Sequence, residues 1–269
     1  MQKNDNEKIT QNLKKIKYKL IVLSGKGGVG KSTVSANLAY ALSTKGYNVG
    51  LLDSDLHGPT IPKMLGVENK KPLPSREGIN PVVVNPHLKV MSTGFLLSEN
   101  DSPVIWRGPL KMGVIKQFIG EVNWGTLDYL IVDLPPGTGD EPLSISQLIP
   151  NSDGAIIVTT PQDVALVSVR KSINFVKKMG YPIVGIIENM SGFICPHCNK
   201  SIDIFKEGGG LKASKDFKVP FLGKIPIDPS IVKTGDLGEP YLIKNNGTKA
   251  GKAFEKIVMK IEQIVNTKR

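Results

Sequence analysis

A glycine-rich turn between a buried strand and a helix constrains the fold of this chain more than any other stretch. Residues 25–32 read GKGGVGKS and fit the pattern G-x-x-x-x-G-K-[S/T]. The apolar run KLIVLS precedes this turn, and residues 32–46 follow it with a helical pattern. In that context the glycines let backbone N–H groups turn inward and hold phosphate at the start of the helix. The motif predicts that Lys31 contacts the β- and γ-phosphates of a nucleotide and that Ser32 binds Mg²⁺.

The remainder of the chain alternates short apolar runs with longer helical patterns, which is typical of a parallel sheet covered by helices. The turn and this alternation predict an α/β fold of the P-loop NTPase type, a three-layer α/β/α sandwich with a mainly parallel sheet. We expect one domain over residues 19–269, preceded by a flexible basic tail over residues 1–18. Residues 66–87 and 192–210 have the composition of loops. Strands are expected at residues 19–24, 48–55, 88–94, 127–137, 154–161, 181–192 and 219–228, and further helices at 163–180 and 248–265.

Carboxylates follow two of the expected strands. Asp53 and Asp55 end one of them, and Asp133 ends another. An aspartate at a strand end beside a phosphate-binding turn is placed to hold Mg²⁺, directly or through water. Acidic residues also end strands as turn formers. Two such ends beside one phosphate-binding turn favour a functional role, with Asp133 as a Mg²⁺ ligand and Asp53 as a residue that tunes the site or braces the loop.

The net charge of +11 is concentrated at the two ends of the chain. Residues 1–19 carry +4 and residues 241–269 carry +5, which leaves +2 for the centre. Basic ends can contact nucleic acid or anionic lipid, but solvated ends that aid solubility explain the pattern more simply. We therefore expect no stable nucleic-acid partner and no membrane partner. The N-terminus lacks the apolar core of a signal peptide, and no stretch approaches the ~20 apolar residues of a membrane span. Together these features predict a cytoplasmic protein.

Both cysteines of the chain lie in SGFICPHCNK, residues 191–200. In a reducing compartment a C-x-x-C pair is typical of metal binding or redox chemistry rather than of a structural disulfide. Cys195 and Cys198 supply two thiolates, whereas a [4Fe–4S] cluster or a Cys₄ zinc site needs four. A thioredoxin-like dithiol and a zinc site that includes His197 remain alternatives, since the ligand type alone does not choose the metal. We assign His197 to the loop rather than to the site.

The form KGGVGKST resembles the deviant phosphate-binding loop of the SIMIBI class of P-loop ATPases, which includes the MinD and ParA families. This resemblance implies that Lys26 reaches across a dimer interface to the partner's nucleotide and that Asp55 positions the attacking water. It also implies catalytic roles for Lys26, Lys31 and Asp55 and adenine contacts near Asn189. The implied nucleotide contacts are Gly25, Lys26, Gly27, Gly28, Val29, Gly30, Lys31, Ser32, Thr33, Asp133, Asn189, Pro226 and Asp228, with Ser32 and Asp133 on Mg²⁺.

Four further segments narrow the resemblance. DSDLHGPTIPKMLG, WRGP, DYLIVDLPPGTGDEPLSISQ and ENMSGFICPHCN are similar, in this order, to the Mrp/ApbC/Nbp branch of MinD-like ATPases. That branch carries iron–sulfur clusters to apoproteins, so the resemblance implies ATP hydrolysis coupled to cluster carriage. The implied partners are cluster scaffold proteins and apo acceptor proteins. The four-cysteine site that some eukaryotic members carry near the N-terminus has no counterpart here, because no cysteine precedes Cys195.

The number of cysteine ligands predicts that the protein assembles as a dimer. A C₂ dimer doubles each residue across its axis, so Cys195 and Cys198 of two chains would hold one bridging [4Fe–4S] cluster. The resemblance implies the same homodimer, and the role implied for Lys26 also needs a partner subunit.

Two other functions remain as alternatives. A positioning or partition ATPase would act on DNA or a membrane surface, with Lys252, Lys256 and Lys260 on one face of the last helix. Such an ATPase has no need of a C-x-x-C pair. A non-catalytic metal scaffold would leave Lys26 and Asp55 without a role.

Overall fold

A computed structural model of the chain describes residues 2–56, 58–96, 108–195, 197–198, 200–202 and 204–267. Segments quoted above that contain residues 57, 106–107, 196 or 199 are therefore described only in part.

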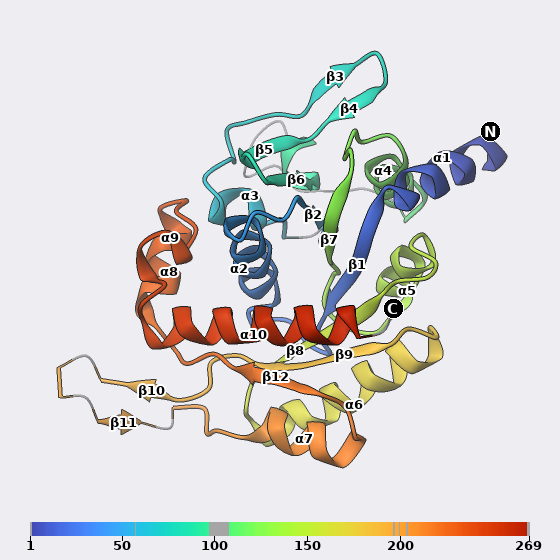
Figure 1. Cartoon of the computed structure of the whole chain (residues 1–269). Helices are drawn as coiled ribbons and strands as arrows, with labels where there is room; N and C mark the ends of the chain where they lie inside the picture. Colours follow the sequence, from blue (N-terminus) through green and yellow to red (C-terminus); the bar gives the residue numbers. More distant parts are fainter. Residues whose placement is uncertain are drawn as a thin grey trace.

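One eight-stranded sheet forms the centre of the molecule (Figure 1). Its order is β12-β9-β8-β1-β7-β2-β6-β5, and every neighbouring pair is parallel except β5 with β6. In chain order the strands are β1 (Ile16–Leu23), β2 (Val49–Asp53), β5 (Val82–Asn85), β6 (Leu88–Ser92), β7 (Leu127–Asp133), β8 (Gly154–Thr159), β9 (Ile183–Glu188) and β12 (Phe221–Lys224).

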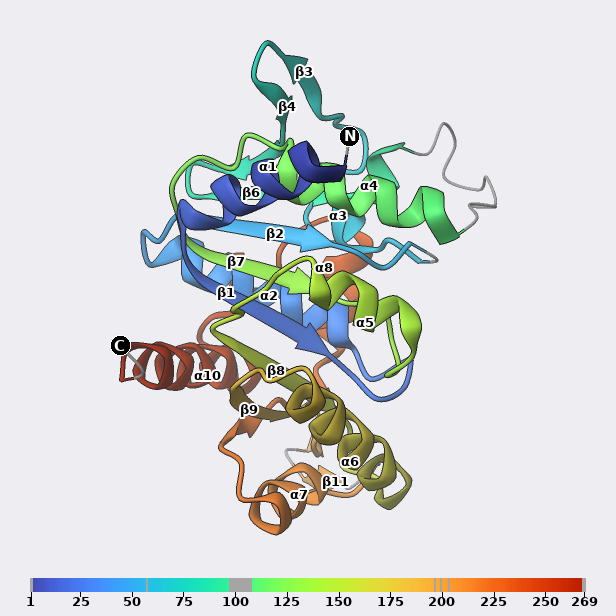
Figure 2. The same ribbon diagram turned by 90° about the vertical axis from the view of Figure 1, so that its right-hand side faces the viewer.

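Helices cover both faces of the sheet (Figure 2). One face carries α2 (Lys31–Thr44), α3 (Ile61–Met64), α8 (Pro229–Asp236), α9 (Leu242–Asn245) and α10 (Lys249–Asn266). The other face carries α1 (Gln2–Lys14), α4 (Gly108–Gly120), α5 (Asp140–Gln147), α6 (Asp163–Lys178) and α7 (Gly209–Phe217). The three-layer α/β/α fold predicted from the sequence is confirmed.

Alternation along β1 divides the core into two. Leu20 and Val22 pack against α2 and α10, whereas Ile21 and Leu23 face the helices of the opposite layer. All four side chains are at most 2% exposed. A strand that is buried on both faces reads as a continuous apolar run, which is why this run was recognisable in the sequence.

The expected flexible tail over residues 1–18 is wrong. Residues 2–14 form α1, and β1 already begins at Ile16. Ile9 and Leu13 lie one helical turn apart and are buried in the same core as α4. The side-chain Nδ2 of Asn12 donates to the backbone carbonyls of Ile119 and Gly120, at the end of α4, at 3.1 Å each, and to that of Val122 at 3.0 Å. This segment therefore belongs to the domain.

Two stretches expected to be loops contain strands. Residues 66–87 include the hairpin of β3 (Leu73–Ser75) and β4 (Gly78–Asn80), as well as β5. Residues 192–210 include the short antiparallel pair of β10 (Phe193–Ile194) and β11 (Ser201–Ile202). A 3₁₀ turn, η1 (Thr93–Leu96), follows β6. Among the described residues, no helix is both long and apolar enough to cross a membrane.

Candidate functional site

The glycine-rich turn connects the central strand β1 to α2. Gly28 and Gly30 have φ angles of 77° and 78°, in the left-handed region that glycine adopts without strain. Gly30 is also the N-cap of α2, and a Cβ there would lie 2.3 Å from Asn189 Nδ2. A Cβ on Gly25 would lie 2.3 Å from the carbonyl oxygen of Ser168. Backbone geometry and close packing both require glycine, and the resulting loop presents a helix N-terminus suited to phosphate.

Asp133, at the end of β7, accepts hydrogen bonds from three polar side chains in the first turns of α2. Its Oδ2 accepts hydrogen bonds from Lys31 Nζ at 2.6 Å and from Ser32 Oγ at 2.7 Å. Its Oδ1 accepts from Ser35 Oγ at 2.6 Å. Asp133 is fully buried, and Lys31 is nearly so. The structure thus brings together three predicted residues, and it adds Ser35, which lies one helical turn after Lys31.

The donor set at this point suits Mg²⁺. A serine hydroxyl and a carboxylate are hard oxygen ligands, of the kind that hold Mg²⁺ together with nucleotide phosphates. Lys31 is the only cation that contacts Asp133 in the described part of the chain. A phosphate group bound in the loop would compete with Asp133 for Lys31 and so free the carboxylate.

Asp53 lies directly beside Asp133 on the neighbouring strand, since β2 pairs with β7 and the two aspartates are in register. Its Oδ2 accepts from Ser92 Oγ at 2.9 Å, and its Oδ1 accepts from the backbone N–H of Asp55 at 3.2 Å. Burial, and next the charge of Asp133, raise the pKa of Asp53 from 3.8 to about 7. Through its hydrogen bond with the N–H of Asp55, Asp53 holds the first residues after β2 in place. Asp55 is half-buried at the same end of the sheet.

Lys26 follows the first glycine of the turn and is half-buried. Its Nζ donates to Gln162 Oε1 at 3.4 Å, and its carbonyl accepts from Ser24 Oγ at 2.9 Å. Within this single chain, Lys26 thus contacts the loop after β8. Its implied role toward a partner subunit stays a prediction.

Asn189 follows β9 and contacts the glycine-rich turn directly. Its Nδ2 donates to the carbonyl of Val29 at 2.9 Å, and the residue is 7% exposed. Asp228, the second residue predicted near adenine, is the N-cap of α8. It accepts from the N–H of Ser230 at 2.8 Å and from the Tyr241 hydroxyl at 2.5 Å. Pro226 is half-buried in the segment before this cap. These contacts are structural, and adenine recognition by the three residues stays a prediction.

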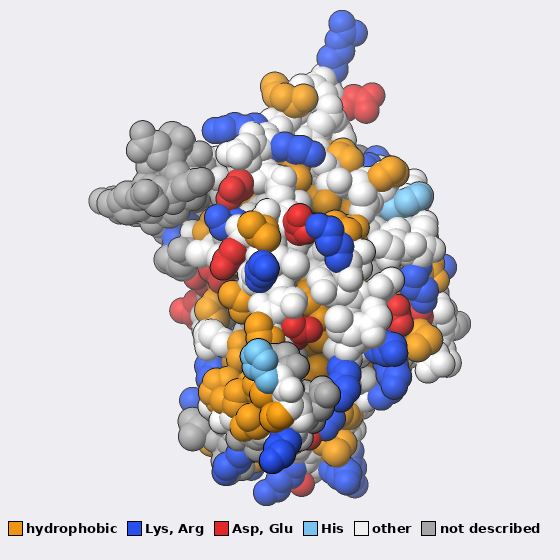
Figure 3. Space-filling model, turned by 90° about the vertical axis from the view of Figure 1, so that its left-hand side faces the viewer, with side chains coloured by type: hydrophobic (Ala, Val, Ile, Leu, Met, Phe, Trp, Pro, Cys, Tyr) orange, Lys and Arg blue, Asp and Glu red, His pale blue; other side chains and the backbone are white. Residues whose placement is uncertain are grey.

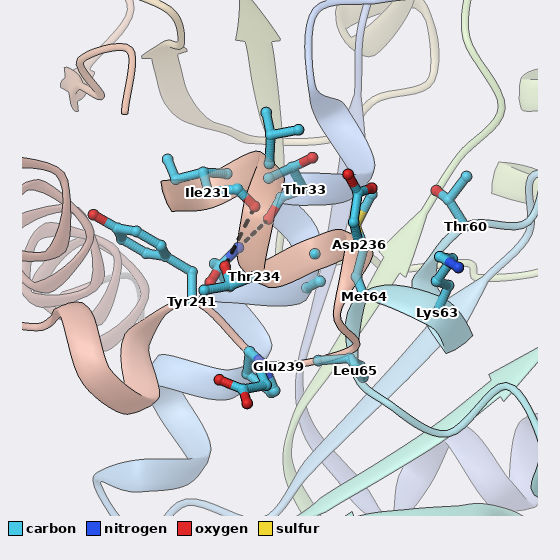
Figure 4. A pocket seen from close by; sticks show the side chains of 15 residues that line it. Thr33, Thr60, Lys63, Met64, Leu65, Ile231, Thr234, Asp236, Glu239 and Tyr241 are labelled. Atoms are coloured by element: carbon cyan, nitrogen blue, oxygen red, sulfur yellow. Dashed lines mark hydrogen bonds between the residues drawn. The ribbon is translucent and has the colours of Figure 1, made fainter. Parts of the chain in front are cut away.

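A cavity of about 240 Å³ lies beside the first turn of α2. Figure 4 shows Thr33, Thr60, Ile231 and Thr234 around it, from α2, α8 and the segment before α3. Asn37 also lines the cavity, and its buried Oδ1 has no hydrogen-bond partner within the described ranges. No sequence pattern predicts this cavity, because its walls come from segments about 200 residues apart in the chain.

The cysteines lie at the turn between β10 and β11. The N–H of Cys195 donates to the carbonyl of Lys200 at 3.0 Å, which closes the turn. Cys195 is half-buried, whereas Cys198 and His197 are exposed. Backbone N–H groups of Cys198 and His197, and then the Cys198 thiol, lower the pKa of the Cys195 thiol. A lowered thiol pKa favours the thiolate form that binds metals.

A single chain offers two thiols, which are fewer than the four ligands of the predicted cluster. Across the part of the chain that the structure describes, no group of three or more His, Cys, Asp or Glu side chains is placed to hold a metal. Hydrophobic side chains gather in the lower part of the face shown in Figure 3, which is the side of the β10–β11 hairpin in Figure 1. Ile202 and Ile204, in and after the hairpin, are 47% and 51% exposed.

Glu188, next to Asn189, holds both ends of the cysteine hairpin. Its fully buried carboxylate accepts from Ser191 Oγ, which precedes the hairpin, at 2.5 Å. It also accepts from the backbone N–H groups of Gly208 at 2.9 Å and Gly210 at 2.5 Å, which follow the hairpin. Consecutive residues at the end of β9 thus contact the glycine-rich turn and the base of the cysteine hairpin. This arrangement is long-range and had no sequence signal.

The comparisons with known proteins agree with this architecture. The family model described as NUBPL iron-transfer P-loop NTPase matches residues 15–262. The iron-sulfur cluster carrier protein of Methanocaldococcus jannaschii is 55% identical over 97% of this chain and 90% of its own length. The cytosolic Fe-S cluster assembly factor CFD1 of Kluyveromyces lactis is 55% identical over 83% of this chain and 81% of its own length.

Solved structures give the same fold. The nucleotide-binding protein of Archaeoglobus fulgidus, solved with ADP, has a TM-score of 0.79 and 42% identity, over 88% of this chain and 92% of that one. The cell division ATPase MinD of Pyrococcus furiosus has a TM-score of 0.66 and 23% identity, over 92% and 99% of the two chains, and shows the fold alone. The matched family model and the close relatives together establish that this chain belongs to the NUBPL iron-transfer family of P-loop NTPases.

Proposed function

We propose that the protein is a homodimeric, ATP-hydrolysing carrier that holds a labile iron–sulfur cluster between two subunits and delivers it to apoproteins. The observation that carries this proposal is the double contact at the end of β9. Asn189 contacts the phosphate-binding turn while Glu188 fastens the cysteine hairpin. The names of the relatives in Methanocaldococcus jannaschii and Kluyveromyces lactis support the same function.

In the nucleotide site, Lys31 leaves Asp133 and binds the β- and γ-phosphates of ATP. Ser32 and Asp133 would hold Mg²⁺, which would supply charge neutralisation on the phosphates. Asp55 orients the attacking water, and Lys26 reaches the nucleotide of the partner subunit. Hydrolysis is slow, since its task is to change the geometry of the dimer rather than to consume ATP.

The cluster is the cargo. Cys195 and Cys198 of each subunit supply four thiolates in a C₂ dimer, which suits a bridging [4Fe–4S] cluster. The exposed position of Cys198 and the exposed apolar side chains around the hairpin leave room for an acceptor to approach. Scaffold proteins load the cluster and apo acceptor proteins receive it, in the cytoplasm, without a stable nucleic-acid or membrane partner.

The alternative, a positioning or partition ATPase, has weaker support. Its relatives among the solved structures are less than 25% identical and share the fold alone. It also leaves the thiolate-favouring environment of Cys195 without a role.

Anaerobic reconstitution tests the cargo. The protein is purified without oxygen, supplied with iron and sulfide, and assayed for iron, sulfide and ATP binding per dimer. We expect a cluster in the wild type, no cluster in a Cys195→Ala, Cys198→Ala variant, and equal ATP binding in both. Zinc without sulfide in the wild type, or unchanged iron in the variant, would overturn the proposal.

Transfer kinetics test the coupling. Cluster delivery to an apo-ferredoxin is followed with ATP, with a non-hydrolysable analogue and without nucleotide. Different rates in these three conditions support nucleotide control, whereas equal rates would remove ATP from the transfer step.

A further inference from the structure

A groove runs along the open edge of the sheet, and Glu188 and Gly208, which hold the base of the cysteine hairpin, are among its lining residues. Strand β12 is the last strand in the sheet order and, among the described strands, pairs with β9 alone. The groove has a volume of about 790 Å³ and is lined by all four residues of β12. Helix α10 forms one wall, and Gly208 with Leu211 of α7 forms the other. Figure 1 shows β12 between these two helices at the lower front of the molecule.

The backbone of β12 faces this groove. The carbonyl of Phe221 accepts from Lys260 Nζ at 3.1 Å, so it points toward α10 and the groove rather than toward β9. The register against β9 shifts between Phe221 and Gly223, and the N–H of Ile225 donates to the carbonyl of Glu188. Alternation on either side of this bulge turns the polar groups of Gly223 to β9 and those of Phe221 and Lys224 to the open edge. An open edge of this kind is a template for pairing with a further strand.

The wall formed by α10 is strongly basic. Lys249, Lys252, Lys256 and Lys260 line the groove at intervals of three or four residues, which places them on one helical face. Within the described ranges, the first three of these make no hydrogen bond or ion pair. Lys224, at the end of β12, adds a fifth lysine and pairs with Glu207 at 2.5 Å.

Acidic side chains do little to balance this charge. Glu188 and Glu207 also line the groove, but Glu207 already pairs with Lys224, and the buried carboxylate of Glu188 already accepts three hydrogen bonds. Apolar atoms lie among the lysines, since Leu211 and Met259 are 39% and 49% exposed. The groove therefore offers strand-pairing groups, positive charge and apolar contacts side by side.

We propose that this groove binds an extended acidic segment of a partner protein, which pairs with β12 as an added strand and places its carboxylates against the lysines of α10. A lipid surface fits less well, because the apolar face of α10 is buried in the core through Ile257, Val258 and Ile261. A DNA duplex fits less well, because the lysines line a groove floored by a strand edge rather than a protruding surface. The groove needs neither ATP nor the cysteines.

A labelled octapeptide, VEVDVEVD, is the probe. Fluorescence anisotropy measures its binding to the wild-type protein and to two variants with the same change of charge. Lys252→Glu, Lys256→Glu alters the groove, and Lys177→Glu, Lys178→Glu alters exposed lysines at the far end of α6. We expect saturable binding that falls about tenfold or more in the groove variant and little in the control. A Cys195→Ser, Cys198→Ser variant binds the peptide as the wild type does, so failure here is separate from failure of cluster binding.

A second peptide, VEVDPEVD, separates strand pairing from simple charge attraction, because proline removes a backbone donor and disfavours a paired strand. Weaker binding of this peptide, with slower amide exchange at Phe221 and Lys224 when VEVDVEVD is bound, supports the added strand. Equal binding of both peptides would overturn it. Binding of phosphatidylserine vesicles or duplex DNA through Lys252 and Lys256, without peptide binding, would also overturn it.

Discussion

Glu188 Oε2 accepts a hydrogen bond of 2.5 Å from the backbone N–H of Gly210, a residue 22 positions further along the chain. The cysteine hairpin lies between these two residues. A buried carboxylate thus fixes the start of α7 relative to the end of β9, and the hairpin is carried between two fixed points. Because Asn189 is bonded to the phosphate-binding turn, a displacement of that turn has a short path to the cysteines.

Glu188→Gln tests this path. Glutamine has one acceptor oxygen for three donors, and its NH₂ group would face at least one N–H or O–H. We expect the free energy of unfolding to fall by about 1–3 kcal/mol, as for buried donors that lose their acceptor. We also expect faster loss of the cluster, while ATP affinity stays near that of the wild type. Urea unfolding and cluster absorbance measure the two effects. Glu207→Gln, at an exposed pair, is the matched control and should change neither.

Lys31→Ala tests the buried ion pair with Asp133. The change leaves a buried carboxylate without its cation, so we expect the apo protein to lose about 3 kcal/mol of stability and the ability to bind ATP. Lys45→Ala removes a more exposed pair with Glu262 and should cost about 1 kcal/mol or less. Equal stability losses in the two variants would contradict the importance assigned to burial.

Asp53 gives the apo protein a pH dependence of known sign. Its pKa is about 7 when folded and 3.8 in the ordinary state, so between these values the folded chain holds a proton that the unfolded chain has lost. The free energy of unfolding therefore falls as the pH rises through this window and levels off above about 7. Asp53→Asn removes the effect. Without Mg²⁺ or nucleotide, we expect the free energy of unfolding of the variant, relative to that of the wild type, to increase by on the order of 2 kcal/mol as the pH rises from about 5 to 8.

The control for this pH series is Asp216→Asn, which changes an exposed aspartate on α7. Its stability difference from the wild type should be constant with pH. A constant or shrinking difference for Asp53→Asn would show that its carboxyl titrates near its ordinary pKa.

Lys26 and Lys31 permit a complementation test of the dimer. If Lys26 acts on the partner's nucleotide, a Lys26→Ala subunit paired with a Lys31→Ala subunit contains one complete site. We expect each variant alone to lose about a hundredfold or more of its ATPase rate, as for other charged residues at phosphoryl transfer. An equal mixture should recover about one quarter of the wild-type rate, because half of the dimers are mixed and each has one active site. No recovery on mixing, with mixed dimers verified by mass spectrometry, would place Lys26 in its own subunit's site.

Sequence patterns predicted those features of the structure that are formed by residues close together in the chain. The turn at residues 25–32, the continuous apolar run of β1 and the aspartate after β7 each carry their own signal, and the structure brings Lys31, Ser32 and Asp133 into contact. The N-terminal helix was missed because two buried side chains, Ile9 and Leu13, are a weak signal in a polar stretch, and their partner α4 lies about 100 residues away.

The role of Glu188 at the base of the cysteine hairpin could not be predicted from the sequence, because its hydrogen-bond partners are also distant in the chain. Glu188 looks like an ordinary strand-ending acid until the fold brings Gly208 and Gly210 to it. The predicted adenine contact of Asp228 stays a prediction, but its carboxylate also caps α8, a role that depends on Tyr241 folding back onto it. Hydrogen-bond partners far apart in the chain leave no spacing to recognise.

The strand order also sets a schedule for synthesis. The strand that leads into the phosphate-binding turn pairs Ile16 with Leu127 and Leu20 with Gly154, so both of its neighbours leave the ribosome long after it does. Until then its apolar residues have no sheet to join and are exposed to aggregation, which is the stage at which chaperones act on such chains. A nascent chain released before residue 154 would carry the complete glycine-rich motif and still be unable to form its nucleotide site.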